Sequence, residues 1–418
     1  MSTTLRCIVK HSSDINLGDV PDSVAALYPA STIDALLALR RDLHRHPELS
    51  LQEERTATQI EAQLAALGIT DVNRVAGTGL IARIPGSDAA RRSDIPSVAI
   101  RGDIDALPIH EETGFDWASD TPGVMHACGH DVHASWAVAA AGLLVEAPAP
   151  GDVLVVFQPA EEIGTGARAI LESGVLDGVC AMFGGHVDRR FAVGEVVVQP
   201  GPLAAASDLF EIELIGRAAH GGRPHEGDDP IVAMASLVLA LQTIVSRRIN
   251  PAWPAVISIG TISAGTAPNI IPERAVISGT IRTQITAVRE QIHEELERLT
   301  QGTAAAHGLT AEFRLKAGAP PVINSERGAK WAQTAATSAL GEAAIVPLGY
   351  TNMASEDFGC YLERMEGCFM RVGARETGGE FIPGHAPNFY AADAAIFVGA
   401  AVFAESARIA SAELADAL

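Results

Sequence analysis

A short stretch of the chain, Met125–His133, carries a thiol, three imidazoles and a carboxylate. An apolar run, Ala134–Val145, follows and predicts a buried helix. Polar groups this dense are unfavourable at a buried helix start unless something binds them. Cys128 and His130 flank one glycine, and their side chains are ligands of zinc and related divalent metals, so we predict a metal site. Two alternatives are an ordinary helix N-terminus with a buried thiol, and a Cys128 nucleophile with a histidine base.

The composition is that of a globular protein, since 48% of the 418 residues are hydrophobic and 19% are charged. The length suffices for two domains. With 30 basic and 51 acidic residues the net charge is −21, which disfavours nucleic acid and anionic membranes as partners. The five scattered cysteines argue against a disulfide framework, and we find no signal peptide and no run long enough to span a membrane, so the cytoplasm is expected.

The order of apolar segments predicts an α/β domain whose sequence is interrupted once by an inserted second domain. Residues 1–30 give no clear signal and are interpreted as an N-terminal extension, and a capping box of Ser31 and Asp34 is expected to open the first helix. From 209 to 315 the order becomes strand, helix, strand, strand, helix, strand, the split βαβ arrangement of ferredoxin-like domains. We therefore expect a catalytic domain made of 31–203 and 317–418, with an inserted domain at 204–316.

More polar residues follow predicted strands, at the position where α/β proteins form their sites. Asp103 and Asp105 follow a strand at 97–102, and His186 follows a strand at 179–184. The candidates together are Cys128, His130, Glu161, Glu162, His186 and His385. These offer more ligands than one tetrahedral ion takes, so two neighbouring metal ions are expected. His44 and His46, near the end of the first helix, are interpreted as surface imidazoles.

Several motifs resemble those of the aminoacylase, carboxypeptidase G and hippurate hydrolase family of dinuclear metallopeptidases, in the branch of the N-acyl-amino-acid amidohydrolases. The resemblance covers about residues 35–415. Its motifs are Arg41–Leu49, Arg101–Pro108, Met125–Asp131, Gln158–Glu162, Ala219–Gly221, Pro224-His225, Ala267–Pro272 and Met353–Phe358. It implies an α/β fold with a mixed-sheet, phosphorylase/hydrolase-like catalytic domain and an inserted ferredoxin-like α+β lid domain that forms a homodimer.

The resemblance also implies a role for particular residues. The implied metal ligands are Cys128, His130, Glu162, His186 and His385, which would hold two divalent ions, manganese or zinc, with cobalt or nickel also accepted. Glu161 matches the general acid/base, and Asp105 matches the residue that orients it. His220, usually of the partner subunit, matches the group that reaches the scissile carbonyl. Asn269 and Arg282 match positions that hold the carboxylate of a small substrate.

We therefore predict hydrolysis of an N-acyl amino acid, aromatic or aliphatic, to a carboxylic acid and an amino acid. A metal lowers the pKa of bound water from about 16 to about 7, and Glu161 would carry the proton of that water to the leaving nitrogen. The guanidinium group of Arg282 has paired N–H donors that suit the two oxygens of a carboxylate. Three alternatives remain open: another C–N bond, such as that of an aminobenzoate or a small peptide; a Cys128 thiol nucleophile; and a metal-binding protein without catalysis.

Overall fold

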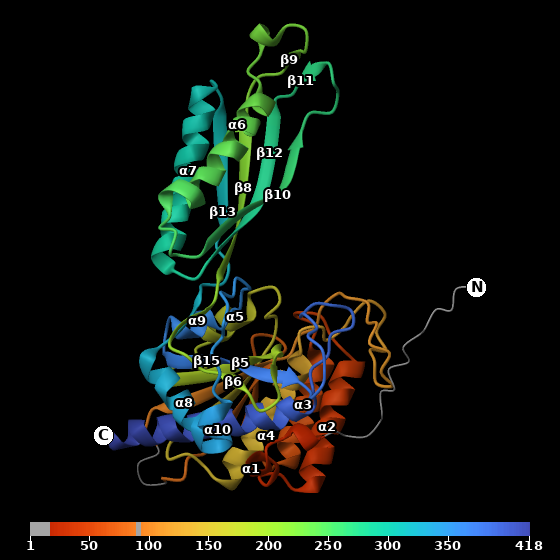
Figure 1. Cartoon of the computed structure of the whole chain (residues 1–418), viewed down its shortest axis with the longest axis vertical. Coiled ribbons are helices and arrows are strands. Elements are labelled where there is room, and N and C mark those ends of the chain that lie inside the picture. Colours follow the sequence, from red (N-terminus) through yellow and green to blue (C-terminus); the bar gives the residue numbers. More distant parts are fainter. Residues whose placement is uncertain (1–16, 89–92) are drawn as a thin grey trace, which may run out of the picture. The chain divides into compact units, whose positions relative to one another are not determined.

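The computed structural model describes residues 17–88 and 93–418, which form two compact units. The first unit comprises the chain up to Gln199 together with Arg327–Pro347 and Met365–Leu418 (Figure 1). The second unit comprises Pro200–Glu326 and Leu348–Arg364. Each unit buries its own cluster of hydrophobic side chains.

The first unit is built on a mixed seven-stranded sheet in the order β1-β2-β4-β3-β5-β15-β6. Its strands are β1 Val72–Val75, β2 Gly79–Ile84, β3 Ser97–Asp103, β4 Val153–Gln158, β5 Val179–Ala192, β6 Val196–Val197 and β15 Glu366–Arg375. The four strands β4, β3, β5 and β15 run parallel, and the flanking strands are antiparallel. Its helices are α1 Asp22–Ala25, α2 Ala30–Arg45, α3 Glu54–Ala66, α4 His130–Glu146, α5 Gly166–Glu172, α8 Glu326–Leu340 and α10 Ala394–Asp416. The sheet is thus mixed, as expected.

The helix that follows the polar stretch lies in the core of this unit. Small alanine side chains line α4 and α10, which pack against each other and against β3. At Gly399 an added Cβ would lie 2.6 Å from the ring of Trp136, so the glycine permits this close packing. A helix that is apolar all round is a buried helix, and α4 therefore fixes its N-cap, Gly129, and its first residue, His130, inside the protein.

The N-terminal part of the described chain is not a free arm. Val24 and Tyr28 are buried, the Tyr28 ring meets the ring of Phe397 at 5.1 Å, and its hydroxyl donates to the Phe397 carbonyl at 3.3 Å. The expected capping box was wrong: α2 begins at Ala30 with Pro29 as its N-cap, and no side chain caps it. Because the helix begins one residue before Ser31, Ser31 stands inside the first turn, where its side chain cannot act as the N-cap.

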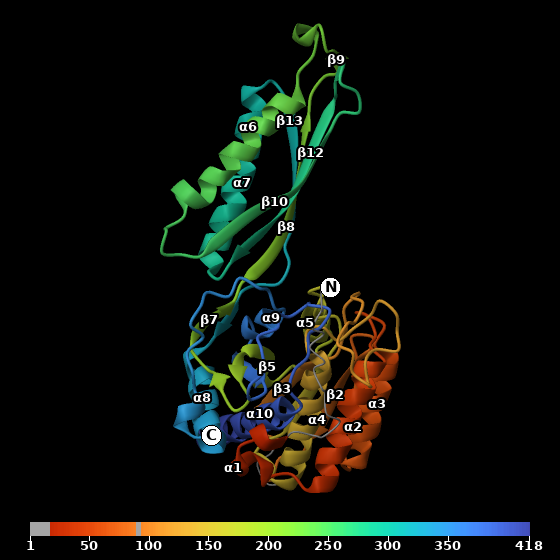
Figure 2. The same ribbon diagram turned by 45° about the vertical axis from the view of Figure 1, so that its right-hand side comes forward.

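The second unit contains a four-stranded antiparallel sheet in the order β10-β12-β8-β13, with two helices on one face (Figure 2). Its elements are β7 Gly201–Ala204, β8 Ala206–Ile215, β9 Ala219–His220, α6 Pro230–Thr243, β10 Ala255–Ala264, β11 Ile270–Ile271, β12 Arg274–Thr283, α7 Thr286–Ala306, β13 Thr310–Lys316, β14 Val322–Asn324 and α9 Gly359–Leu362. Side chains along β12 alternate between buried and less buried positions, as expected when one face packs on helices.

Two described helices are long and apolar enough to span a membrane by length and composition, which we did not expect: Pro230–Arg248 and Ala394–Asp416. In Ala394–Asp416, 83% of the most apolar window is buried inside the fold, as in the core helix of a globular protein. Pro230–Arg248 is α6 extended by a π-helical turn, and only 33% of its most apolar window is buried. That helix therefore presents an apolar face outward.

Candidate metal centre

The polar residues of the first unit converge where the parallel strands end. β3 and β4 are parallel neighbours, so the chain leaves both strands at the same edge of the sheet, toward Asp105 and Glu161-Glu162. At the start of α4, Gly129 has a φ of 89°, and an added Cβ there would lie 2.5 Å from a methyl group of Val187. This left-handed turn favours glycine and separates Cys128 from His130.

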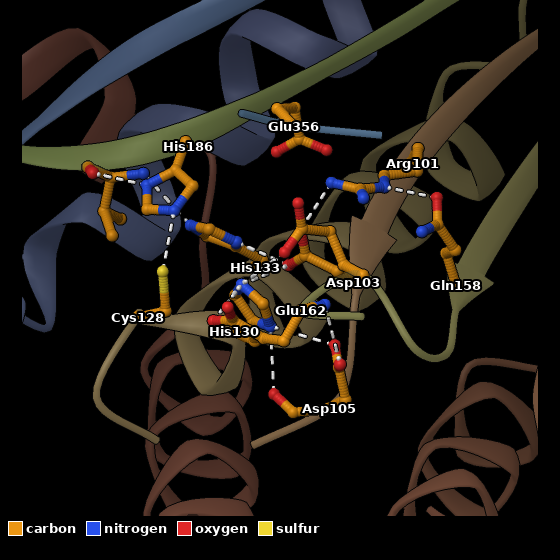
Figure 3. Close-up of polar contacts among 12 residues, drawn as sticks. Arg101, Asp103, Asp105, Cys128, His130, His133, Gln158, Glu162, His186 and Glu356 are labelled. Atoms are coloured by element: carbon orange, nitrogen blue, oxygen red, sulfur yellow. Dashed lines mark hydrogen bonds and ion pairs between the residues drawn. The ribbon is translucent and has the colours of Figure 1, made fainter. Parts of the chain in front are cut away.

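All five implied ligands meet in two overlapping groups. The donor atoms of Cys128, His130 and His186 lie within 4.8 Å of one another, and so do those of Cys128, Glu162 and His385. The Cys128 sulfur lies 3.1 Å from His186 Nε2, and the two side chains face each other in Figure 3. Because Cys128 belongs to both groups, the arrangement suits two neighbouring ions that share one ligand.

Two buried atoms in this cluster have no hydrogen-bond partner among the described residues, His130 Nε2 and Glu162 Oε1. They lie 3.8 Å apart, and His385 Nε2 lies 3.6 Å from the same Glu162 oxygen. These separations are too long for hydrogen bonds. Two ligand atoms on a tetrahedral ion, each about 2.1 Å from the metal, are about 3.4 Å apart. The donor set therefore fits divalent metal ions.

The charges in the cluster also favour bound cations. Loss of hydration, followed by the charge of Glu162, raises the pKa of the Cys128 thiol well above its usual range. Burial raises the pKa of Glu162 as well, against the attraction of His130 and His385. Burial lowers the pKa of His130, but Asp103 and Asp105 outweigh it and raise the pKa well above its usual value. A bound cation would stabilise the thiolate and carboxylate and would take the place of the extra proton on His130.

Asp105 contacts two of the candidate ligands, His130 and Glu162, but belongs to neither ligand group. His130 Nδ1 donates to the Asp105 carbonyl at 2.9 Å and lies 3.2 Å from its Oδ1, which leaves Nε2 for an ion (Figure 3). Asp105 Oδ2 accepts the N–H of Glu162 at 3.0 Å and the hydroxyl of Ser50 at 2.7 Å. The carboxylate therefore orients a ligand imidazole and the Glu161-Glu162 backbone together.

The sequence reasoning missed a second support, built on His133. Its Nδ1 lies 2.6 Å from Asp103, and its Nε2 accepts the Val187 N–H at 3.0 Å. The Val187 carbonyl in turn accepts from His186 Nδ1 at 2.7 Å, so His186 Nε2 is left to face Cys128. The signal in the sequence was the spacing, because His133 stands three residues after His130 and shares its face of the helix.

Two expectations about histidines were wrong. His44 is not a surface imidazole: it is 1% exposed, its Nδ1 lies 3.0 Å from Asp131, and its ring meets the edge of Trp117. The packing of α2 against α4 buries it. His186 does not follow a strand, because β5 continues to Ala192 on β15 after its pairing with β3 has ended at Phe183. His46, 37% exposed, is at the surface as expected.

The remaining predicted residues belong to the second unit. His220 and Asn269 are both exposed and adjacent, because β9 pairs with β11 and the Gly221 N–H donates to the Asn269 carbonyl at 2.8 Å. Arg282 lies in β12 and is half-buried, and its burial lowers the pKa of the guanidinium. His220 and Asn269 therefore form a pair, and Arg282 is not part of it.

A parallel-stranded α/β unit with overlapping Cys, His and Glu ligand groups defines a metallohydrolase class of site. Residues 99–408 match the family described as peptidase family M20/M25/M40. The chain belongs to this family, which confirms the resemblance, and it is a hydrolase that acts on carbon–nitrogen bonds.

Three relatives illustrate the similarity. The chain is 41% identical over 384 residues to an N-acetylcysteine deacetylase of Bacillus subtilis, covering 90% of this chain and 96% of that one. It is 40% identical over 296 residues to an N-acyl-L-amino acid amidohydrolase of Geobacillus stearothermophilus, covering 70% and 79%. A crystal structure of a Bacillus subtilis protein described as a dinuclear metal-binding peptidase from the M20 family is similar with a TM-score of 0.79 at 37% identity, covering 91% and 99%.

Proposed function

We propose that this protein hydrolyses the amide bond of N-acyl amino acids, releasing a carboxylic acid and an amino acid. The observation that carries the proposal is the pair of ligand groups that share Cys128, with Glu161 beside them: the donor atoms of His130, Glu161 and Glu162 also lie within 4.8 Å of one another. The names of the two relatives above support N-acyl amino acids as the substrate class.

Two divalent metal ions would be held by the five residues of these groups, with manganese or zinc first and cobalt or nickel as further candidates. When bound, such ions supply an activated water at neutral pH and polarise a carbonyl oxygen. The chain supplies the remaining functions. Glu161 Oε2 lies 4.0 Å from His130 Nε2 and is not among the five ligands, so it is placed to take a proton and return it to the leaving nitrogen.

The geometry of the second unit supports a substrate site shared between two subunits. Arg282 pairs with Ser207 at one end of the sheet, and Arg274 pairs with Ile215 at the other end, which leads into β9 and His220. Arg274 and Arg282 are eight residue steps apart along β12, about 26 Å at the usual rise of a strand. One substrate therefore cannot meet His220 and Arg282 of the same second unit. We infer that His220 and Asn269 reach the active site of a partner subunit.

We propose that this partner is a second copy, docked through the second unit. The strand order β10-β12-β8-β13 with two helices on one face is the ferredoxin-like arrangement, which we assign as the inserted dimerisation domain at 204–316, between the catalytic segments 31–203 and 317–418. Its outward helix face exposes Ile231, Val232 and Leu239, the last 73% exposed, and β10 leaves one edge of the sheet unpaired. Exposed apolar patches and open edges mark interfaces.

Leu239→Glu tests the dimer. Sedimentation velocity should show a shift from dimer to monomer, because a charge in an apolar interface opposes association. Thr334→Glu, at an exposed residue of α8 in the first unit, is the matched control for the added charge, because it leaves the outward face of α6 unchanged. A wild-type protein that is monomeric at micromolar concentration would contradict the homodimer.

The decisive experiment on function is product identification by mass spectrometry with N-acetyl and N-aroyl amino acids, aminobenzoyl conjugates and dipeptides. Free amino acid from the acylated substrates supports the proposal, whereas turnover of only the other substrates would show that the enzyme cleaves another C–N bond.

Glu161→Gln should reduce kcat by at least about 100-fold with metal retained, as expected for a general acid/base. Unchanged function in this variant would favour a metal-binding protein, and activity that survives metal removal but not alkylation of Cys128 would favour a thiol nucleophile.

The cellular setting remains a prediction. The described cysteines Cys128, Cys180, Cys360 and Cys368 form no disulfide with one another, which supports a reducing compartment and hence the cytoplasm. Cys7 lies outside the described residues. The net charge of −21 supports a small-molecule substrate, with neither nucleic acid nor a membrane as a partner.

A further inference from the structure

A buried carboxylate outside the metal cluster, that of Glu53, contacts the turn that carries Glu161. Glu53 is 0% exposed and occupies the N-cap position of α3, yet its side chain does not cap the helix. The N–H groups of Arg55 and Thr56 donate instead to Glu48, at 3.2 and 2.8 Å. The Glu53 carboxylate points elsewhere: it accepts the Thr78 hydroxyl at 2.6 Å and the N–H of Ala160 at 2.9 Å.

The residue whose N–H it accepts has an unusual backbone conformation. Ala160 has a φ of 54°, in the left-handed region, although it carries a Cβ, and it directly precedes Glu161. Such a conformation is unfavourable by about 1 kcal/mol or more for a residue other than glycine, and it persists only where the surroundings hold it. The Ala160 carbonyl accepts the N–H of Gly166 at 3.2 Å, where an added Cβ would lie 1.7 Å from the Pro159 oxygen. The turn is therefore closely packed and strained.

The two peptide N–H groups on either side of Glu161 are each bound by a carboxylate. Glu53 accepts that of Ala160, and Asp105 accepts that of Glu162 at 3.0 Å. The loop between α2 and α3 reaches both, because Ser50 donates to Asp105 at 2.7 Å. This one loop therefore fixes the backbone of the Glu161-Glu162 pair from two directions.

We propose that Glu53 is a positioning residue for Glu161, holding Ala160 in its left-handed turn so that the Glu161 carboxylate stays beside His130 and Glu162. The role rests on the proposed function, in which Glu161 transfers protons. Stability does not explain the carboxylate: its burial raises the pKa of Glu53, so the ionised group is unfavourable there despite its two hydrogen bonds. A carboxylate does, however, offer one oxygen to Thr78 and one to Ala160, and a misplacement of about 1 Å can reduce turnover by about 100-fold.

The test compares E53M, which fills the same space without an acceptor, with E53Q, which keeps one acceptor oxygen. Per metal-loaded subunit, E53M should lower kcat by about tenfold or more with KM changed by less than about threefold, and E53Q should recover most of that loss. E48M is the matched control, because Glu48 stands in the same loop and, among the described residues, its side chain accepts from the N–H groups of Arg55 and Thr56 in α3. It should lower the melting temperature and leave kcat per loaded subunit unchanged.

A second substitution separates positioning from general damage. Glycine adopts positive φ without strain, so A160G should raise kcat more in the E53M background than in the wild type. If E53M gives no folded protein, Thr78→Val removes the hydroxyl that orients Glu53 and should lower kcat by about threefold or more. An unchanged kcat in E53M, or in Thr78→Val where E53M does not fold, would overturn the proposal.

Amide hydrogen exchange provides a readout that does not depend on activity. In the metal-free protein, exchange of the Ala160 N–H should be faster in E53M than in the wild type and in E48M, because this N–H loses its acceptor. Equal exchange would refute the positioning role whatever the kinetics show. If the wild type hydrolyses no N-acyl amino acid but exchange still responds to E53M, the positioning stands and the proposed substrate class falls.

Discussion

The support of His186 by His133 yields a quantitative prediction. His133→Phe keeps an aromatic ring beside Trp136, whose ring is stacked on it at 4.3 Å, and removes the hydrogen bonds to Asp103 and to the Val187 N–H. The Val187 N–H is then buried without an acceptor, which is unfavourable by about 1–3 kcal/mol. Loss of such an outer contact typically weakens metal binding by about 10- to 100-fold, or about 1.4–2.7 kcal/mol.

Only one of the two ions should be affected. His186 belongs to the group with Cys128 and His130, whereas Glu162 and His385 belong to the other group. Competitive titration with a chromophoric chelator should therefore show two binding steps, of which one is weakened. His133→Gln, which can still accept the Val187 N–H, should restore most of the affinity.

Trp331→Phe is the control for loss of stability alone. Trp331 is buried in the same unit and donates to Glu413 at 2.7 Å, and neither residue belongs to a ligand group. This change should lower the free energy of unfolding and leave both binding steps in place. The reasoning would be refuted if His133→Phe bound both ions as tightly as the wild type, or if Trp331→Phe weakened the same step.

Three further predictions concern metal removal, pH and packing. Metal at about 100 times its dissociation constant should add about 2.7 kcal/mol of stability; calorimetry should show this rise, and Cys128→Ala should reduce it. Burial raises the pKa of Asp208, but the hydrogen bond to Arg289 outweighs burial, and the net shift of this pKa is downward. The ionised Asp208 therefore stabilises the folded state above about pH 4, and this stabilisation is lost as the pH falls through the folded-state pKa. Asp208→Asn should therefore be less stable than the wild type by about 3 kcal/mol near neutral pH, with a smaller difference in urea melts near pH 3. Tyr28→Ala should lower the free energy of unfolding by about 3 kcal/mol, because it empties the space against Phe397.

The sequence by itself determined much of the secondary structure and the choice of candidate ligands. The expected strand at 97–102 matches β3, and the buried helix predicted at 134–145 lies within α4, since the pattern of apolar residues is a local property of the chain. Cys128, His130 and Glu162 were identifiable as candidate ligands because a metal accepts few side chains, and those side chains are unfavourable at buried turns unless bound. Their motif order also identified the family.

The tertiary structure alone decided which residues support that chemistry. His44 and Glu53 look like ordinary residues near helix ends, and their burial follows from contacts with Asp131 and Ala160, which lie 87 and 107 residues further along the chain. His133 gains its role only where β5 brings Val187 beside α4. The type of a residue alone shows whether its side chain can bind a metal. Any polar residue, by contrast, can form a supporting hydrogen bond, and only the packing of the fold, which removes water from around the residue, decides which one does.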